Sequence, residues 1–164
     1  MHYDRIYRFL AHMCRQEHVA EDLTQETFAA AWAAMGRFNG SSSLLTWMHQ
    51  IARNKFLDHC RRERRSAQVA ADEHPGRDFE RRDPLANLLA DEQDRQLGRA
   101  LAALAPESRE AVVLHYSQGL SYRDMAHVLG EPVGTVKWRI SQAMKELKAI
   151  WASGEKHDSG IRQI

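Results

Sequence analysis

The sequence has few cysteines and no long hydrophobic run, and these absences exclude several classes of protein. Two cysteines, Cys14 and Cys60, among 164 residues cannot form a disulfide framework, so a reducing cytoplasm is the simplest compartment. No apolar run approaches the roughly 20 residues that a membrane-spanning helix needs. The N-terminal residues HYDRIYRF do not resemble a signal peptide. We therefore expect a chain that does not insert directly into a membrane.

The clustered side chains that metal sites and hydrolytic enzymes need are also missing. The nine histidines and two cysteines include no CxxC or HxxxH spacing, and the adjacent His59 and Cys60 point to different faces of a helix. The acids that stand together are those expected at helix starts. We expect no metal, no other cofactor and no enzymatic activity. A metal-dependent nuclease is the enzymatic alternative, and a chelator would inhibit it.

No segment alternates apolar and polar residues over a useful length, so no β-strand is predicted. We expect an all-α fold of two small helical domains joined by a flexible acidic linker, with a helix-turn-helix in the second domain. The predicted segments are a first domain (1–65), the linker (66–94), a second domain (95–153) and a frayed tail (154–164). Each domain is too small to bury much surface alone, which favours a role for partners.

The charge of the chain is segregated. Residues 66–94 hold eight acids against three basic residues, and Pro75–Gly76 is a turn signal. Helix is expected to resume after Asp83–Pro84. An apolar stripe follows, made of Leu85, Leu88, Leu89, Leu97, Leu101 and Leu104. Although the net charge is only +1, residues 53–65 carry +4 and residues 133–149 carry +3, which suits contacts with phosphates.

Residues 120–147 predict a helix, a tight turn and a second helix. Ser121 and Asp124 have the spacing of a capping box, while Gly130 and Pro132 mark the end of one helix and the start of the next. The inward stripe of the second helix is predicted to be Val136, Ile140, Met144 and Leu147. The outward side chains, placed as in a helix that reads the major groove, are Thr135, Trp138, Arg139, Gln142 and Lys145. An ordinary helical hairpin with a solvated charged face is the alternative.

Residues 20–35 predict another amphipathic helix. Its buried face is expected to consist of Phe28, Ala31, Trp32 and Met35. A polar patch on another side consists of Asp22, Gln25 and Glu26. Such acids favour the first turn of a helix through its dipole, and they are equally suited to docking a basic protein surface. Spacing alone does not choose between these interpretations.

A polar loop, residues 37–43, precedes a long helix expected from Leu44 to about Arg65. The core side of this helix is predicted to hold Leu45, Met48, Ile51, Ala52 and Phe56. A mainly basic stripe on another side holds Asn54, Asp58, Arg61, Arg62 and Arg65. The stripe suits phosphates, and a polar loop beside aromatic side chains suits single-stranded bases. Trp47 is equally suited to a place in the core and to a contact with a base, and the same two alternatives apply to Phe38.

Three motifs in this order resemble the extracytoplasmic-function sigma factors, the smallest bacterial sigma factors. They are AEDLTQETFAAAW (20–32), TWMHQIARNKFLDHCRRERR (46–65) and GLSYRDMAHVLGEPVGTVKWRI (119–140). The match covers nearly the whole chain, with a linker in the expected place. The resemblance implies a non-enzymatic subunit that binds core RNA polymerase and directs it to promoters.

The resemblance also implies a role for each surface. Asp22, Gln25 and Glu26 match the patch that contacts the clamp helices of the largest polymerase subunit. The minus-ten element would be recognised, and one base flipped out of the stack, by Arg37, Asn39, Ser41, Ser42, Ser43, Trp47, Asn54, Arg61 and Arg62. The minus-thirty-five element would be read as duplex by Thr135, Lys137, Trp138, Arg139, Gln142 and Lys145. The linker would pass near the RNA exit path of polymerase.

Three features depart from the family pattern. Family members usually have another helix before the one that holds Tyr3 to Met13; here that helix is either missing or the chain starts late. Trp138 stands where a small residue such as serine is usual, and this bulky side chain should change promoter preference. The alternatives for it are a contact with a thymine methyl group, a contact with a phosphate-flanking sugar, and packing against the other helices. The residues after Trp151 match nothing in the family.

The resemblance implies regulation by an anti-sigma factor that covers the polymerase-binding and DNA-binding faces. A stand-alone helix-turn-helix transcription regulator is the alternative function. Such a regulator would dimerise and bind a palindrome without polymerase.

Overall fold

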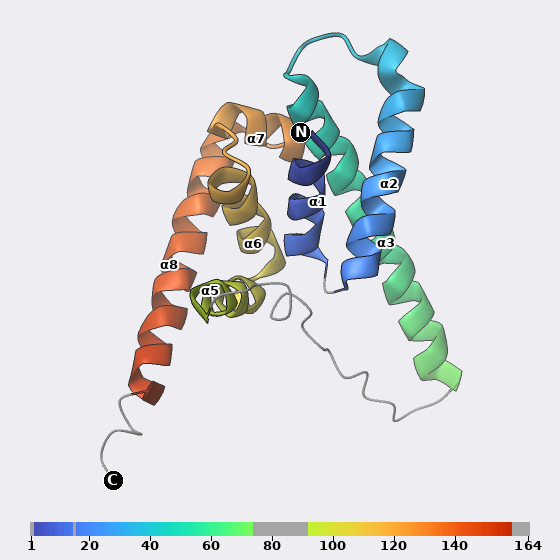
Figure 1. Ribbon diagram of the computed structural model, residues 1–164. Coiled ribbons are helices and arrows are strands. Elements are labelled where there is room, and N and C mark those ends of the chain that lie inside the picture. Colours follow the sequence, from blue (N-terminus) through green and yellow to red (C-terminus); the bar gives the residue numbers. More distant parts are fainter. Residues whose placement is uncertain (1, 15, 74–91, 159–164) are drawn as a thin grey trace. The chain divides into compact units, whose positions relative to one another are not determined.

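The computed structural model describes residues 2–14, 16–73 and 92–158, and the regular elements within these ranges are helices (Figure 1). The chain divides into two compact units, residues 1–84 and 85–164. The all-α prediction is therefore confirmed for the residues described. Much of the predicted linker lies outside them, including Pro75–Gly76, Asp83–Pro84 and the leucines at 85, 88 and 89, as do tail residues 159–164.

The first unit is built from α1 (His2–Met13), α2 (Glu17–Ala34), the 3-10 turn η1 (Met35–Arg37) and α3 (Leu44–Glu73). The helices α1, α2 and α3 pack against one another. The buried stripe of α1 recurs at helical spacing and consists of Ile6, Phe9, Leu10 and Met13. Burying side chains of this size contributes about 1.5–3 kcal/mol each, so α1 anchors the core of the unit.

The buried face of α2 is not the predicted one. It consists of Ala20, Leu23, Thr24, Thr27 and Ala31. Trp32 is instead 82% exposed and Met35 43% exposed, so their predicted burial was wrong, while Phe28 is half-buried. The hydroxyls of Thr24 and Thr27 donate to carbonyls one turn earlier in α2, at 2.6 and 2.7 Å. Because their polar atoms are satisfied within the helix, these small residues pack like apolar ones.

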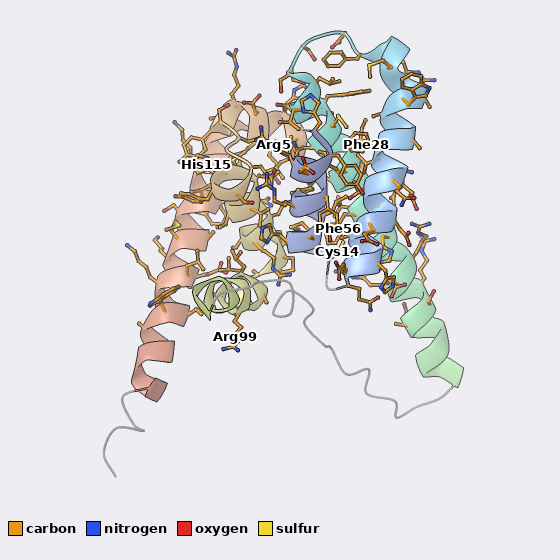
Figure 2. All side chains as sticks on the ribbon, viewed as in Figure 1. Arg5, Cys14, Phe28, Phe56, Arg99 and His115 are labelled. Carbon is orange, nitrogen blue, oxygen red and sulfur yellow. The ribbon has the colours of Figure 1, made fainter. Side chains whose placement is uncertain are left out.

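The core side of α3 was predicted largely correctly. Met48 and Ala52 are buried, as are Thr46 and His49, which were not predicted. The predicted core residues Leu45, Ile51 and Phe56 are half-buried. Figure 2 labels Phe56 together with the buried Cys14 among the side chains of this unit.

The helix α3 continues to Glu73, well beyond its predicted end near Arg65. Residues 66–73, the start of the predicted linker, are therefore helical. Their sequence, SAQVAADE, is rich in residues of good helix propensity and contains no glycine or proline.

The second unit contains α5 (Glu92–Ala103), α6 (Pro106–Val112), the short π-helix η2 (Val113–Ser117), α7 (Tyr122–Leu129) and α8 (Val133–Asp158). The long α8 packs against α5, α6 and α7. One core cluster joins Leu101, Leu104, Val112 and Ala143, with Leu147 and Ile150 at its edge. The frayed tail predicted for residues 154–164 is helical as far as residue 158, because α8 continues to that point.

Polar contacts fix the helices of the second unit to one another. The carboxylate of Glu146 on α8 accepts hydrogen bonds from the hydroxyl of Ser108 (2.7 Å) and the backbone N–H of Ala105 (3.3 Å) at the start of α6. The guanidinium of Arg109 donates to carbonyls at the end of α5, including those of Leu101 (2.8 Å) and Ala102 (2.6 Å). The backbone N–H of Ala105 and the carbonyls at the end of α5 are groups that helix ends leave without partners, and these hydrogen bonds satisfy them.

Candidate protein-docking and nucleic-acid interfaces

The predicted polar patch lies on the exposed face of α2. Asp22, Gln25 and Glu26 are all exposed and stand within about one turn of each other. Glu26 also forms an ion pair with Lys55 of α3, with 3.3 Å between Oε2 and Nζ. Two turns beyond Gln25, the indole of Trp32 is 82% exposed on the same helix. Sequence reasoning missed Trp32 because its spacing also fits a buried stripe.

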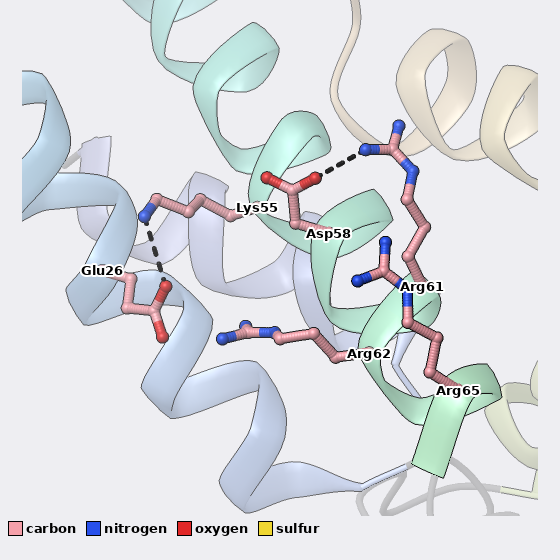
Figure 3. Close-up of a pocket in the computed structure, with 6 residues that line it drawn as sticks. All are labelled: Glu26, Lys55, Asp58, Arg61, Arg62 and Arg65. Carbon is pink, nitrogen blue, oxygen red and sulfur yellow. Dashed lines mark hydrogen bonds and ion pairs between the residues drawn. The ribbon is translucent and has the colours of Figure 1, made fainter. Parts of the chain in front are cut away.

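The ion pair lies at one edge of a pocket of about 330 Å³ between α2 and α3 (Figure 3). The lining side chains are Glu26, Lys55, Asp58, Arg61, Arg62 and Arg65. Asp58 pairs with Arg61 at 2.7 Å, and Figure 3 shows Arg62 extending from α3 toward α2. Four basic side chains against two acids give this pocket a positive balance, which suits an anionic group such as a phosphate.

The predicted basic stripe of α3 is exposed as expected. Asn54 and Asp58 are exposed, and so are Arg61, Arg62 and Arg65. Arg37, in η1 at the other end of the preceding loop, is exposed as well. The predicted exposure of these positions is confirmed, and their contact with phosphates stays a prediction.

The polar loop before α3 is held in shape by its own side chains. The side-chain oxygen of Asn39 accepts from the backbone N–H of Ser41 at 3.0 Å, and Gly40 adopts the left-handed conformation with φ 72°. Ser43 caps α3, because its hydroxyl accepts from the backbone N–H of Thr46 at 3.0 Å. Ser41 is exposed and Ser42 is half-buried. The loop therefore presents ordered hydrogen-bonding groups.

Trp47 occupies an intermediate position between the two predicted alternatives. It is half-buried, and its ring centroid lies 5.2 Å from that of Phe38, with the planes tilted by 42°. Phe38 is half-buried as well. The pair forms a partly exposed aromatic surface directly beside the polar loop, which suits stacking against an unpaired base.

The helix-turn-helix of the second unit has the predicted caps. The hydroxyl of Ser121 accepts from the backbone N–H of Asp124 at 3.1 Å, and Gly130 ends α7 in the left-handed conformation with φ 69°. Pro132 directly precedes α8. The ring of His115, labelled in Figure 2, stacks 4.8 Å from that of Tyr122 and braces η2 against the start of α7.

The first turns of α8 present the predicted outward face, with one correction. Thr135, Lys137 and Lys145 are exposed, and Trp138 is 62% exposed. Gln142 is half-buried. Arg139 does not face outward as predicted: its side chain is only 15% exposed and forms an ion pair with Glu131 in the turn before α8. The ion pair joins residues on the two sides of the start of α8, and such a contact cannot be predicted from residue spacing along a single helix.

The inward stripe of α8 is confirmed at Val136 and Ile140, which are buried, while Met144 and Leu147 are half-buried. Sequence reasoning missed Arg123, which is exposed on α7. In helix-turn-helix proteins the first helix crosses the DNA backbone, so an exposed arginine there fits a phosphate contact.

The cysteines lie in surroundings that suppress their reactivity. Burial raises the pKa of the Cys14 thiol to about 12, and burial also raises the pKa of the half-buried Cys60 thiol. Within residues 2–14, 16–73 and 92–158, no group of three histidine, cysteine or acidic side chains is placed to hold a metal ion. No helix in these ranges is long and apolar enough to cross a membrane.

Comparison with known proteins identifies the family. Residues 1–66 match the family Sigma-70 region 2, and residues 94–147 match Sigma-70, region 4. The ECF RNA polymerase sigma factor SigE of Mycolicibacterium smegmatis is 37% identical over 99% of this chain, which spans 62% of that protein. The ECF RNA polymerase sigma factor SigC of Mycobacterium tuberculosis is 37% identical over 88% of this chain and 76% of that protein.

A solved structure supports the same family. The sigma factor RpoE of Bartonella quintana, solved in complex with the anti-sigma factor NepR, matches with a TM-score of 0.75 and 28% identity over 92% of both chains. The chain belongs to the extracytoplasmic-function (ECF) sigma factors. The resemblance read from its three motifs is thereby confirmed.

Proposed function

We propose that this chain is a cytoplasmic, non-enzymatic subunit that binds core RNA polymerase and selects promoters for transcription. The observation that carries the proposal is the presence of two chemically different exposed faces on separate compact units. One is an exposed acidic and aromatic face on α2, and the other is an exposed basic and aromatic face on α8. A stand-alone DNA-binding regulator has no need of the first.

The polymerase-binding surface is proposed to consist of Asp22, Gln25 and Glu26, extended by Trp32. Carboxylates suit a basic partner, and an exposed indole supplies a large rigid apolar contact of the kind that dominates protein interfaces. Because Trp32 is already outside the core, a partner can cover it without any rearrangement of the unit.

The minus-ten surface is proposed to combine the polar loop with α3. The groups that face the unpaired strand are Arg37, Asn39, Ser41, Ser42, Ser43 and Trp47, and the groups along the adjoining backbone are Asn54, Arg61 and Arg62. Unstacking a base costs a few kcal/mol, which stacking and hydrogen bonds must offset. A loop ordered before binding lowers that cost further, since little conformational entropy is lost on contact.

The minus-thirty-five surface is proposed to be the first turns of α8, with Thr135, Lys137, Trp138, Gln142 and Lys145 facing the major groove. Arg139 acts through Glu131, holding the turn that sets the approach of α8. Arg123 on α7 contributes a phosphate contact. An anti-sigma factor is the proposed regulator, as in the RpoE–NepR complex of the structural relative.

Transcription in vitro tests the proposal. Purified protein, bacterial core polymerase and promoter fragments from the source genome are combined, and transcripts are sequenced. Specific transcripts that require both proteins are expected. A chain that neither co-elutes with core polymerase nor supports transcription, and that binds duplex DNA alone as a dimer, would instead be a stand-alone regulator.

A further inference from the structure

We propose that Trp138 determines promoter specificity by contacting the C5-methyl group of a thymine in the minus-thirty-five element. The inference rests on the proposed function, since it requires that α8 enter the major groove. It goes further by naming the residue, the base and the chemical group that discriminate between promoters.

The first observation is the position of the indole. Trp138 lies in the second turn of α8 and is 62% exposed, so it is not packed into the unit. Two of its neighbours one turn away are small: Gly134 precedes it by four residues and Ser141 follows it by three. A Cβ added at Gly134 would meet nothing within 4 Å, which leaves the approach to the indole open.

The second observation is the state of the neighbouring arginine. An arginine on a recognition helix most often reads guanine by two hydrogen bonds. Arg139 is only 15% exposed, and its guanidinium is paired with the carboxylate of Glu131 in the turn before α8, so it is engaged within the unit. The large side chain that this part of α8 offers to a base edge is therefore the indole.

The chemistry of the indole then selects the base. An indole has a broad apolar body and one N–H donor, with no acceptor. In the major groove, thymine presents a methyl group beside the O4 acceptor, while cytosine presents an amino donor and no methyl group. Thymine therefore matches both parts of the side chain. Lys137 and Lys145, both exposed, are suited to the flanking phosphates.

The experiment removes the methyl group alone. Holoenzyme is assembled from core polymerase and the full chain, and the promoter is taken from the transcription assay. Each thymine on either strand of the upstream element is replaced in turn by deoxyuridine, which keeps O4. At one or two positions the transcript yield of the unmodified chain at limiting holoenzyme should fall roughly three- to tenfold, as expected for the loss of one buried methyl group.

Trp138→Ser introduces the small residue usual in the family and should give equal yields with thymine and uracil at those positions. Trp151→Ser is the matched control, because Trp151 is 51% exposed on the same helix, about 20 Å further along, and this variant should keep the discrimination. Thermal unfolding of all three proteins verifies that they are folded.

Two outcomes would overturn the inference while leaving the proposed function intact. In the first, the unmodified chain transcribes equally well after every uracil replacement. This outcome includes a loss of yield by Trp138→Ser on all templates alike, which is the result expected if Trp138 contacts a sugar and not the methyl group. The other is a thymine preference that survives in Trp138→Ser. No transcription at all by the unmodified chain, with no binding to core polymerase, would instead refute the proposed function, and the inference with it.

Discussion

Glu26 on α2 and Lys55 on α3 form an ion pair with 3.3 Å between Oε2 and Nζ, so an acid proposed to bind polymerase is already paired inside the folded unit. The two side chains are 44% and 35% exposed, and a pair this accessible to water contributes little to stability. It can therefore open at small cost when a basic partner approaches. The pair also joins the proposed polymerase surface to the helix proposed to contact DNA.

The double substitution Asp22→Ala with Glu26→Ala should weaken binding to core polymerase at least tenfold, an effect of roughly 1.4 kcal/mol or more, and leave folding intact. The reason is that both side chains are exposed and carry the charge of the patch. Competition against a reference sigma factor for core polymerase measures the change.

Lys55→Ala is the matched control for that prediction. It removes the partner of Glu26 without removing either acid, so it should bind core polymerase as well as the unmodified chain does. If Lys55→Ala reproduced the defect, the acid would be acting through its ion pair, and the docking role of Glu26 would be rejected.

Trp32→Ala should also weaken binding to core polymerase, by about 1–2 kcal/mol or more, while the thermal unfolding midpoint stays within a degree or two. An 82% exposed indole adds little to the stability of the unit but offers a large contact area to a partner. Trp151→Ala, which removes an exposed indole from the second unit, should leave the affinity for core unchanged. Equal affinity of Trp32→Ala and the unmodified chain would exclude the indole from the interface.

Glu146→Gln should lower the stability of the second unit by about 1–3 kcal/mol. The carboxylate accepts from the Ser108 hydroxyl and from the backbone N–H of Ala105, the residue before α6, whereas a neutral amide accepts only weaker bonds through a single oxygen. Urea unfolding followed by circular dichroism measures the loss. Lys145→Gln, a change at the neighbouring exposed position, should have almost no effect; a similar loss in both variants would point to a general effect on α8.

Stability should fall as the pH is lowered below about 6.5, partly because of His12. Burial and the nearby Arg8 lower the pKa of His12 below its ordinary value of 6.5. The unfolded chain then binds the proton first, so the contribution of His12 is complete above pH 6.5 and is lost as the pH falls through the lowered pKa. Unfolding midpoints at pH 7.5 and 5.5 should differ less in His12→Gln than in the unmodified chain. The exposed His18→Gln serves as the control and should keep the full difference.

Cys14 should resist alkylation in the folded protein. With burial raising its pKa to about 12, only about one molecule in ten thousand carries the thiolate at pH 8, and the thiolate is the reactive form. Iodoacetamide followed by mass spectrometry should find Cys14 unmodified in buffer and rapidly modified in urea. Rapid labelling of Cys14 in buffer would show that the first unit opens readily and would contradict the prediction.

Features governed by local chemistry could be predicted from the sequence. The cap of α7 at Ser121 and its left-handed end at Gly130 depend on residues within one turn, and both were predicted correctly. The exposed stripe of α3 was likewise predicted, because charged residues recurred at helical spacing. Such signals need no knowledge of which other helix packs nearby.

Features set by tertiary packing could not be predicted in this way. On α2, two different stripes satisfy the helical period, and the larger side chains favoured the wrong one. Close packing selected the small residues around Thr24 and left Trp32 outside. The pairing of Arg139 with Glu131 spans eight residues and a change of direction at the turn, so no period of a single helix contains it. The roles of the surface residues stay predictions until the variants are measured.

The continuity of α8 has a consequence for the design of altered specificity. One helix of 26 residues carries the proposed base-reading side chains near its start and core residues such as Ile140 and Ala143 further along. The exposed positions Gly134, Thr135, Lys137, Trp138 and Ser141 can be randomised together, since none of them supports the core. A selection for variants that use new promoters would therefore change the DNA-reading side chains while the second unit stays folded.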